Sequence, residues 1–171
     1  MVDRILIDTL HLKSRDFAIR WKDKIRKASH LKHYNALEDG PLLELNGAVY
    51  STLSRTLDRG IDRTLVGNFF VTLGKARMQE EFPISEVIYA LNLAQQTVIE
   101  YIMTDFALDN PVRMYQAMGA ITRVAEFFIL GCFYTTKGFL EATYIHMNKQ
   151  DAVSEGLLKK YFKDDFFFKK D

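Results

Sequence analysis

Few side chains in this sequence have the spacing that catalysis or metal binding requires. The four histidines are His11, His30, His33 and His146, and only His30 and His33 are close enough to share one helix face. No HExxH or Glu-x-x-His arrangement accompanies this pair, which lies in a polar, basic stretch and is therefore predicted to be a solvated turn. We expect no metal centre.

The single cysteine and the paired acids supply no catalytic group either. Cys132 lies among aromatic residues of a helical segment, where burial would raise the pKa of its thiol and leave it inert. Adjacent acids occur at Glu80-Glu81 and Asp164-Asp165, but neighbouring residues on a helix point in different directions and cannot serve one substrate as acid and base. The nucleotide-binding patterns GxxxxGK[ST] and GxGxxG do not occur in the sequence. We therefore predict that the protein is not an enzyme.

The composition of the chain narrows the kinds of partner and the cellular location that we expect. The chain has 171 residues, of which 23 are basic and 22 acidic, so no strong field attracts nucleic acid. One cysteine excludes an internal disulfide and fits a reducing compartment. The longest uncharged stretches, residues 127–136 and 87–99, are too short to span a bilayer, and the N-terminus does not resemble a signal peptide. We expect a cytoplasmic protein without nucleic-acid or membrane partners.

Helical spacing of apolar residues runs through the chain, and no segment shows the sustained alternation of a strand. Five helices are predicted, over residues 2–29, 41–59, 62–81, 84–106 and 111–149. Asn110-Pro111 indicates the start of the last helix, because asparagine caps a helix and proline is favoured at its first position. Gly60 is expected to end the second helix. The predicted fold is an all-α bundle of five or six helices, globin-like, with a long C-terminal helix.

The last predicted helix is apolar on two faces. One stripe consists of Met114, Met118, Ile121, Ala125, Phe128, Cys132, Thr135 and Phe139, and the other of Ala117, Ala120, Val124, Phe127, Gly131, Tyr134 and Gly138. Such a helix is either central to a bundle or shared between a core and a dimer interface. The small residues at 119, 120, 131 and 138 would let another helix approach closely. If the protein is a homodimer, the interface is predicted at Met114, Met118, Ile121, Phe128 and Phe139.

Two units are predicted, a bundle over residues 1–150 and a tail over residues 151–171. In the tail, three phenylalanines at 166–168 stand between Asp164-Asp165 and Lys169-Lys170. Three adjacent exposed aromatic rings would be costly in water. We therefore expect the tail to dock on the bundle or on a partner protein.

Four short motifs resemble one known domain type. They are Arg20-Trp21, the segment LGKARMQ at 73–79, the segment FPISEV at 82–87 and the segment ALNL at 90–93. Together they resemble the N-terminal domain of RsbT co-antagonist (RsbRD-type) proteins, over residues 2–147. The resemblance implies a bacterial stress-response sensor, related to globin-like domains that lack haem, which dimerises through its helices and precedes a signalling output domain. Whether this sensor is free-standing or part of a longer protein stays open.

An aromatic-rich bundle with few polar groups suits an apolar or aromatic ligand held between helices. The candidate ligand-binding residues are Phe70, Arg77, Tyr89, Tyr101, Phe128 and Tyr134, and Arg77 would bind a carboxylate. The alternative is that all six are ordinary core or surface residues. We expect a non-catalytic signal-sensing domain that has no cofactor and that binds a signalling protein as its partner. A haem-binding globin-like sensor and an adaptor without a ligand are the alternatives, and His11 and His146 stand near helix ends rather than where a haem ligand is expected.

Overall fold

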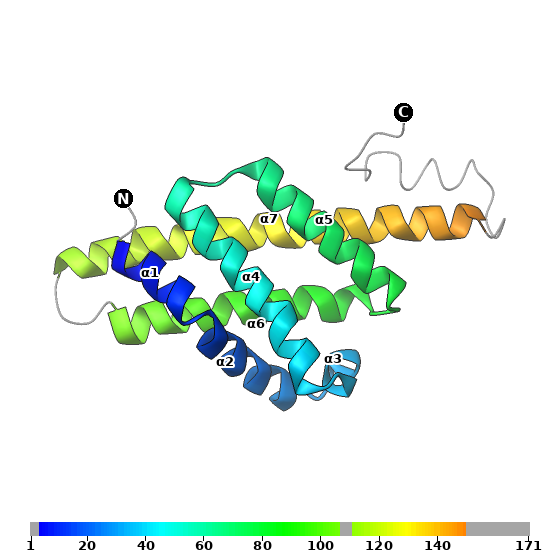
Figure 1. The fold of residues 1–171 in the computed structure, drawn as a ribbon, viewed down its shortest axis with the longest axis horizontal. Coiled ribbons are helices and arrows are strands. Elements are labelled where there is room, and N and C mark those ends of the chain that lie inside the picture. The colour runs from blue at the N-terminus through cyan, green and yellow to red at the C-terminus, as the bar shows by residue number, and fades with distance from the viewer. Residues whose placement is uncertain (1–3, 107–110, 150–171) are drawn as a thin grey trace.

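The computed structural model describes residues 4–106 and 111–149, and every regular element in these ranges is a helix (Figure 1). The elements are α1 (Arg4–Leu12), α2 (Ser14–Lys27), α3 (Lys32–Ala36), α4 (Asp39–Arg59), α5 (Arg63–Gln79), α6 (Ile84–Tyr101) with a π-helical extension η1 (Ile102–Phe106), and α7 (Pro111–Lys149). The predicted all-α bundle with a long C-terminal helix is confirmed. The tail over residues 151–171 lies outside the described residues, so its docking stays a prediction.

The N-terminal part contains more helices than the sequence pattern indicated. The predicted helix over residues 2–29 is divided at Lys13, whose backbone angles are φ −102° and ψ 16°. The division lets α1 pack on α4 while α2 packs on both α4 and α6. The polar link before α4 contains the short helix α3. The described ranges therefore hold seven α-helices where five or six were predicted.

Helix α7 runs the length of the molecule, with α6 alongside it and α5 crossing it (Figure 1). Its buried side is made mainly of the second predicted stripe, namely Ala117, Ala120, Val124, Phe127, Gly131 and Gly138. Phe127 and Val124 are fully buried in the hydrophobic core. One of the two apolar faces thus serves the bundle itself, because α5 and α6 cover it.

Glycines allow α5 and α7 to pack almost backbone to backbone. A Cβ atom at Gly138 would lie 2.8 Å from main-chain atoms of Val71, and a Cβ at Gly131 would lie 2.7 Å from the ring of Phe70. On the other helix, Gly74 faces the α7 backbone in the same way. The small residues at 131 and 138 were predicted to let another helix approach closely. In the structure that helix is α5 of the same chain.

Buried hydrogen bonds tie the N-terminal helices to α6. The indole nitrogen Nε1 of Trp21 on α2 donates to the carbonyl oxygen of Ala90 at 2.8 Å. The hydroxyl of Tyr50 on α4 donates to the carbonyl oxygen of Ala94 at 3.2 Å. Since both rings are buried, each bond satisfies a polar group that would otherwise be costly in the core. These bonds fix how α2 and α4 lie on α6.

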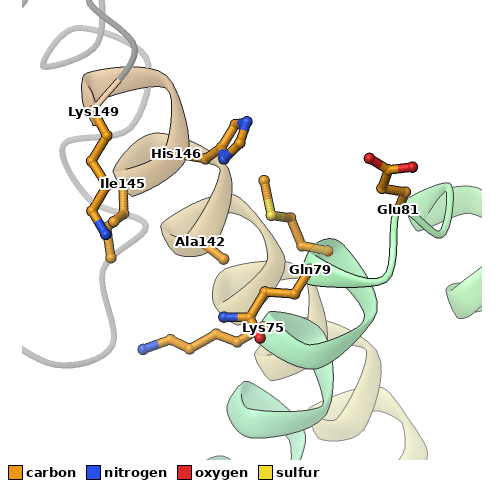
Figure 2. A pocket seen from close by; sticks show the side chains of 8 residues that line it. Lys75, Gln79, Glu81, Ala142, Ile145, His146 and Lys149 are labelled. Carbon is orange, nitrogen blue, oxygen red and sulfur yellow. The ribbon is translucent and has the colours of Figure 1, made fainter.

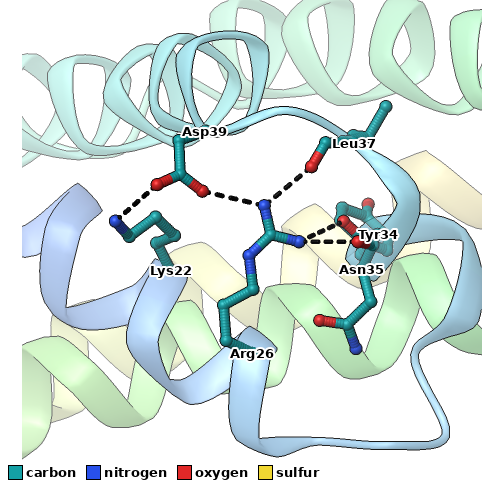
Figure 3. Close-up of polar contacts among 6 residues, drawn as sticks. All are labelled: Lys22, Arg26, Tyr34, Asn35, Leu37 and Asp39. Atoms are coloured by element: carbon teal, nitrogen blue, oxygen red, sulfur yellow. Dashed lines mark hydrogen bonds and ion pairs between the residues drawn. The ribbon is translucent and has the colours of Figure 1, made fainter.

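One arginine of α2 holds the connection between α3 and α4 (Figure 3). The guanidinium of Arg26 donates to three main-chain carbonyl oxygens, those of Tyr34 and Asn35 at the end of α3 and that of Leu37 in the connection, at 3.3, 2.8 and 2.7 Å. It also pairs with Asp39 at 2.8 Å, and Lys22 binds the second carboxylate oxygen at 2.9 Å. The hydrogen bonds from Arg26 and Lys22 hold the pKa of Asp39 below its usual value. The planar five-donor guanidinium suits this clamp better than a lysine would.

Among the described helices, α7 is the one whose length and composition would allow it to cross a membrane. In its most apolar window, 33% of the residues are buried inside the bundle. Core helices of soluble proteins pass the same test of length and composition, and those helices are mostly buried. The packing of α7 against α4, α5 and α6 is compatible with a soluble protein.

Candidate functional site

The residues predicted to bind a ligand are not gathered around one cavity. Phe70 and Phe128 are fully buried, and Phe127 contacts both rings at centroid distances of 5.2 Å. Tyr101 packs edge-on against Phe17 at 5.1 Å. These rings fill the space between helices instead of lining a void.

Tyr89 and Tyr134 lie elsewhere on the bundle. The side chain of Tyr89 on α6 is 42% exposed and meets the ring of His30 at 4.5 Å. Tyr134 on α7 is half-buried beside Phe133, at 5.2 Å. The sequence placed both tyrosines in one ligand site, but their helices turn these side chains toward different neighbours.

Arg77 is the predicted ligand residue with the most unusual surroundings. It is only 8% exposed, and its guanidinium lies 4.8 Å from the ring centre of Phe82. Its terminal nitrogens pair with the Glu80 carboxylate at 2.9 and 3.1 Å, so its charge is compensated within the chain. The buried Nε has no hydrogen-bond partner. An unpaired buried donor is destabilising by about 1–3 kcal/mol, so a hydrogen-bond acceptor that reached this nitrogen would stabilise the protein.

Arg77 borders a groove between α4 and α5, here called the α4–α5 groove, with a volume of about 540 Å³. Its apolar lining consists of Leu45, Ala48, Leu65, Phe69, Leu73 and Ala76. Thr52, Arg55, Asn68 and Thr72 complete the lining. The volume falls in the range of small-molecule sites. Of the six predicted ligand residues, Arg77 is the one that lines this groove.

A second hollow, of about 330 Å³, lies where the C-terminal ends of α5 and α7 meet (Figure 2). Lys75 comes from α5, while His146 and Lys149 come from α7, and the acidic Glu81 after α5 also borders the hollow. The charge of Lys75 is compensated by Glu141, which is 5% exposed and lies 3.2 Å away. Within residues 4–106 and 111–149, no group of three metal-ligating side chains is brought together.

His33 forms a hydrogen-bonded pair with Glu86 that the sequence did not indicate. Its Nδ1 lies 2.9 Å from Oε1 of Glu86, and its main-chain N–H donates to Oε2 at 3.0 Å. Burial by itself would raise the pKa of Glu86, but the hydrogen bonds from His33 outweigh it and hold that pKa below its ordinary value. The two residues are 53 positions apart, and no local pattern predicts such a pair. In place of the solvated turn expected here, His33 lies in the short helix α3 and contacts α6 through Glu86.

The remaining histidines and the cysteine lie where they offer little chemistry. His11, His30 and His146 are exposed, as is the ring of His33, and a globin-like haem ligand would have to face the interior. This placement gives no support to the haem alternative. Burial raises the pKa of the half-buried Cys132 thiol, as predicted.

The predicted dimer residues divide between the surface and the core. Met114 and Met118 are 60% and 62% exposed, while Ile121 and Phe139 are half-buried. Phe128 is fully buried, so including it in a surface interface was wrong. The predicted stripe has a spacing of 3.5 residues, and a straight helix drifts by about 20° per heptad relative to that spacing. The stripe consequently begins on the surface at Met114, enters the core at Phe128 and ends at the half-buried Phe139.

A different set of apolar side chains faces away from the bundle along α7. Tyr115, Met118, Ile129 and Phe133 are 81%, 62%, 66% and 54% exposed, and we call them the α7 outer face. Their spacing of three, eleven and four residues keeps them on one side of a helix. Gly119 lies on this side beside a hollow of about 500 Å³, and a Cβ atom there would meet nothing within 4 Å.

No family model, no curated protein and no solved structure matches this chain. The resemblance to RsbRD-type domains therefore depends on the short motifs of the sequence, and the function must be argued from the surfaces of the bundle.

Proposed function

We propose that this chain is a non-catalytic, cytoplasmic regulatory domain that acts as a homodimer joined through the α7 outer face. The observation that carries this proposal is the row of large exposed apolar side chains on that face. The row extends over 19 residues from Tyr115 to Phe133, which is about 27 Å of helix. The exposed Thr122 and Glu126 separate the row into two apolar clusters, Tyr115 with Met118 and Ile129 with Phe133. Large apolar side chains gathered on one exposed face are typical of a surface that meets a partner.

The pattern on this face is complementary to itself. When two copies of α7 are placed antiparallel about a two-fold axis at the level of residue 124, each Tyr115 stands opposite Phe133 of the second copy. The same operation places Ile129, 66% exposed, over the open surface at Gly119. A large side chain of one copy thus meets a position without a side chain on the other. The face is therefore complementary to itself, as an isologous interface requires. The aromatic pair at each end adds contact area.

The resemblance to RsbRD-type domains supports the same conclusion from another direction. It implies a helical sensor that dimerises and passes a signal to an output partner. In such a module, a change in how two α7 helices pack would be the event that the partner detects. Stress signalling is accordingly the cellular role that we propose.

Sedimentation equilibrium on the purified chain tests the interface. We expect wild-type protein at twice the 19.8 kDa mass of the chain. The substitution Ile129→Glu places a charge in the apolar face and should give a monomer, because the carboxylate would have to be buried unpaired. The matched control is Leu12→Glu, which changes a leucine that is 80% exposed on α1 and should leave the dimer intact.

Gly119→Leu provides a second, independent variant. A Cβ atom at this position meets no atom of its own chain within 4 Å, so the bundle should fold normally and the circular dichroism spectrum should be unchanged. It fills the hollow that Ile129 of the second copy would enter, and dimers should be lost. A monomeric wild type, or dimers that persist in both Ile129→Glu and Gly119→Leu, would refute the proposed interface.

A further inference from the structure

The α4–α5 groove has a defined length and an apolar middle. Helix α5 turns back along α4 after a short connection (Figure 1). The lining of the groove comes from these two helices. On α5 its lining extends from Leu65 to Arg77, and at 1.5 Å per residue this is about 18 Å. Between these ends lie Phe69, Leu73 and Ala48, so an extended hydrocarbon chain would meet apolar surface along its path.

The end of the groove at Leu65 carries an uncompensated cation. Arg55 is exposed and donates to the hydroxyl of Thr52 at 3.4 Å. Among the described residues it has no carboxylate partner. A guanidinium in this state can receive an anionic group as a bidentate hydrogen-bonding partner.

The opposite end presents a different requirement. The charge of Arg77 is already compensated by Glu80, so an anion gains little there. Its Nε–H, however, is buried and unpaired in a side chain that is 8% exposed. A neutral oxygen acceptor would satisfy this donor without adding charge.

We propose that the α4–α5 groove binds one linear amphiphile that has an anionic head at Arg55, a hydrocarbon chain along Leu73 and a neutral oxygen function at Arg77. The volume of about 540 Å³ accommodates a single such chain. The groove is formed by α4 and α5, whereas the proposed dimer interface is formed by α7. Ligand binding and dimerisation can therefore be tested, and can fail, separately.

Isothermal titration calorimetry with three probes of equal chain length tests the proposal on the full chain. The probes are 12-hydroxydodecanoate, dodecanoate and dodecanol, used as monomers. We expect saturable one-to-one binding of both carboxylates, with the hydroxylated one several-fold tighter because it pairs with the Nε–H of Arg77. Dodecanol should bind about tenfold more weakly than dodecanoate or not measurably, since it lacks the charge that Arg55 receives.

Two variants and their controls connect binding to the groove. Arg55→Gln should weaken dodecanoate about tenfold, and the exposed Arg15 on α2 supplies the control Arg15→Gln, which should change nothing. Ala48→Trp fills the groove from an exposed position of α4 and should abolish binding of both carboxylates, with an unchanged circular dichroism spectrum.

Three results would overturn the proposal. The first is an absence of saturable binding by either carboxylate. The second is dodecanol binding as tightly as dodecanoate, which would remove the role of Arg55. The third is co-sedimentation with vesicles of anionic lipid in protein that binds no monomeric probe, which would indicate a membrane surface as the ligand. Sedimentation equilibrium on the same samples reports the dimer independently of each result.

Discussion

Replacing Gly74 with alanine probes the closest contact in the bundle, the one between α5 and α7. A Cβ atom at this position would lie 2.8 Å from the main-chain nitrogen of Phe139 and 2.9 Å from the carbonyl carbon of Thr135. Both atoms belong to the backbone of a long helix, so no rotamer change can remove the overlap. The two helices would have to move apart along the stretch where they pack most tightly.

Two effects of opposite sign decide the result. Alanine is favoured over glycine inside a helix by about 0.8–1.0 kcal/mol. Overpacking a well-filled contact is destabilising by about 1–3 kcal/mol, and a rigid backbone obstacle corresponds to the upper part of that range. We therefore expect Gly74→Ala to lower the free energy of unfolding by about 1–2 kcal/mol. For a chain of this length, that lowers the melting temperature by about 2–8 °C.

Urea unfolding followed by circular dichroism measures this difference, and Gly47→Ala is its control. Gly47 lies within α4, and a Cβ atom there would meet nothing within 4 Å. The control should therefore raise the free energy of unfolding by about 0.5–1 kcal/mol through helix propensity alone. A Gly74→Ala protein as stable as the control would show that the close approach of α5 and α7 is wrong.

Two further predictions concern buried charges. The lowered pKa of Glu86 means that its hydrogen bonds with His33 stabilise the fold above the ordinary glutamate pKa, and that this contribution is lost as the pH falls through the lower folded value. Glu86→Gln should therefore lower stability at neutral pH and flatten the acid-side decline of the urea midpoint, whereas an unchanged pH profile would contradict the pairing. Lys75→Met removes the ion-pair partner of Glu141, which is 5% exposed. The free energy of unfolding measured in urea should fall by about 2 kcal/mol, and the half-exposed position of the lysine makes this loss smaller than for a fully buried pair. The double variant Lys75→Met, Glu141→Met should recover most of that loss, and equal instability of the single and double variants would refute the explanation.

Local patterns were sufficient to locate most of the helices. The proline at 111 begins α7, and Gly60 ends α4 with φ at 86°, the left-handed conformation that glycine adopts at low cost. Asp62 caps α5 by accepting hydrogen bonds from the N–H groups of Thr64 and Leu65. These signals lie within a few residues of one another, so they can be read without knowledge of the fold. The break at Lys13 has no such signal, because it results from how α1 and α2 pack on other helices.

The candidate site was harder to predict, because each of its groups depends on a distant neighbour. The sequence singled out Arg77, but not the groove that α4 and α5 form beside it. It placed Phe70 and Phe128 in a ligand site, whereas the structure packs both rings into the core. It gave no indication that His33 meets Glu86.

By itself, therefore, the sequence determined the all-helical class, the ends of the main helices and the two apolar faces of the last helix. Only the tertiary structure decided which of those faces α5 and α6 cover, which side chains remain exposed on the α7 outer face, and where a groove opens between α4 and α5. The physical reason is the range of the forces involved. Helix propensity and capping act over a few residues, whereas the rotation of each helix about its axis is set by the packing of all its neighbours together.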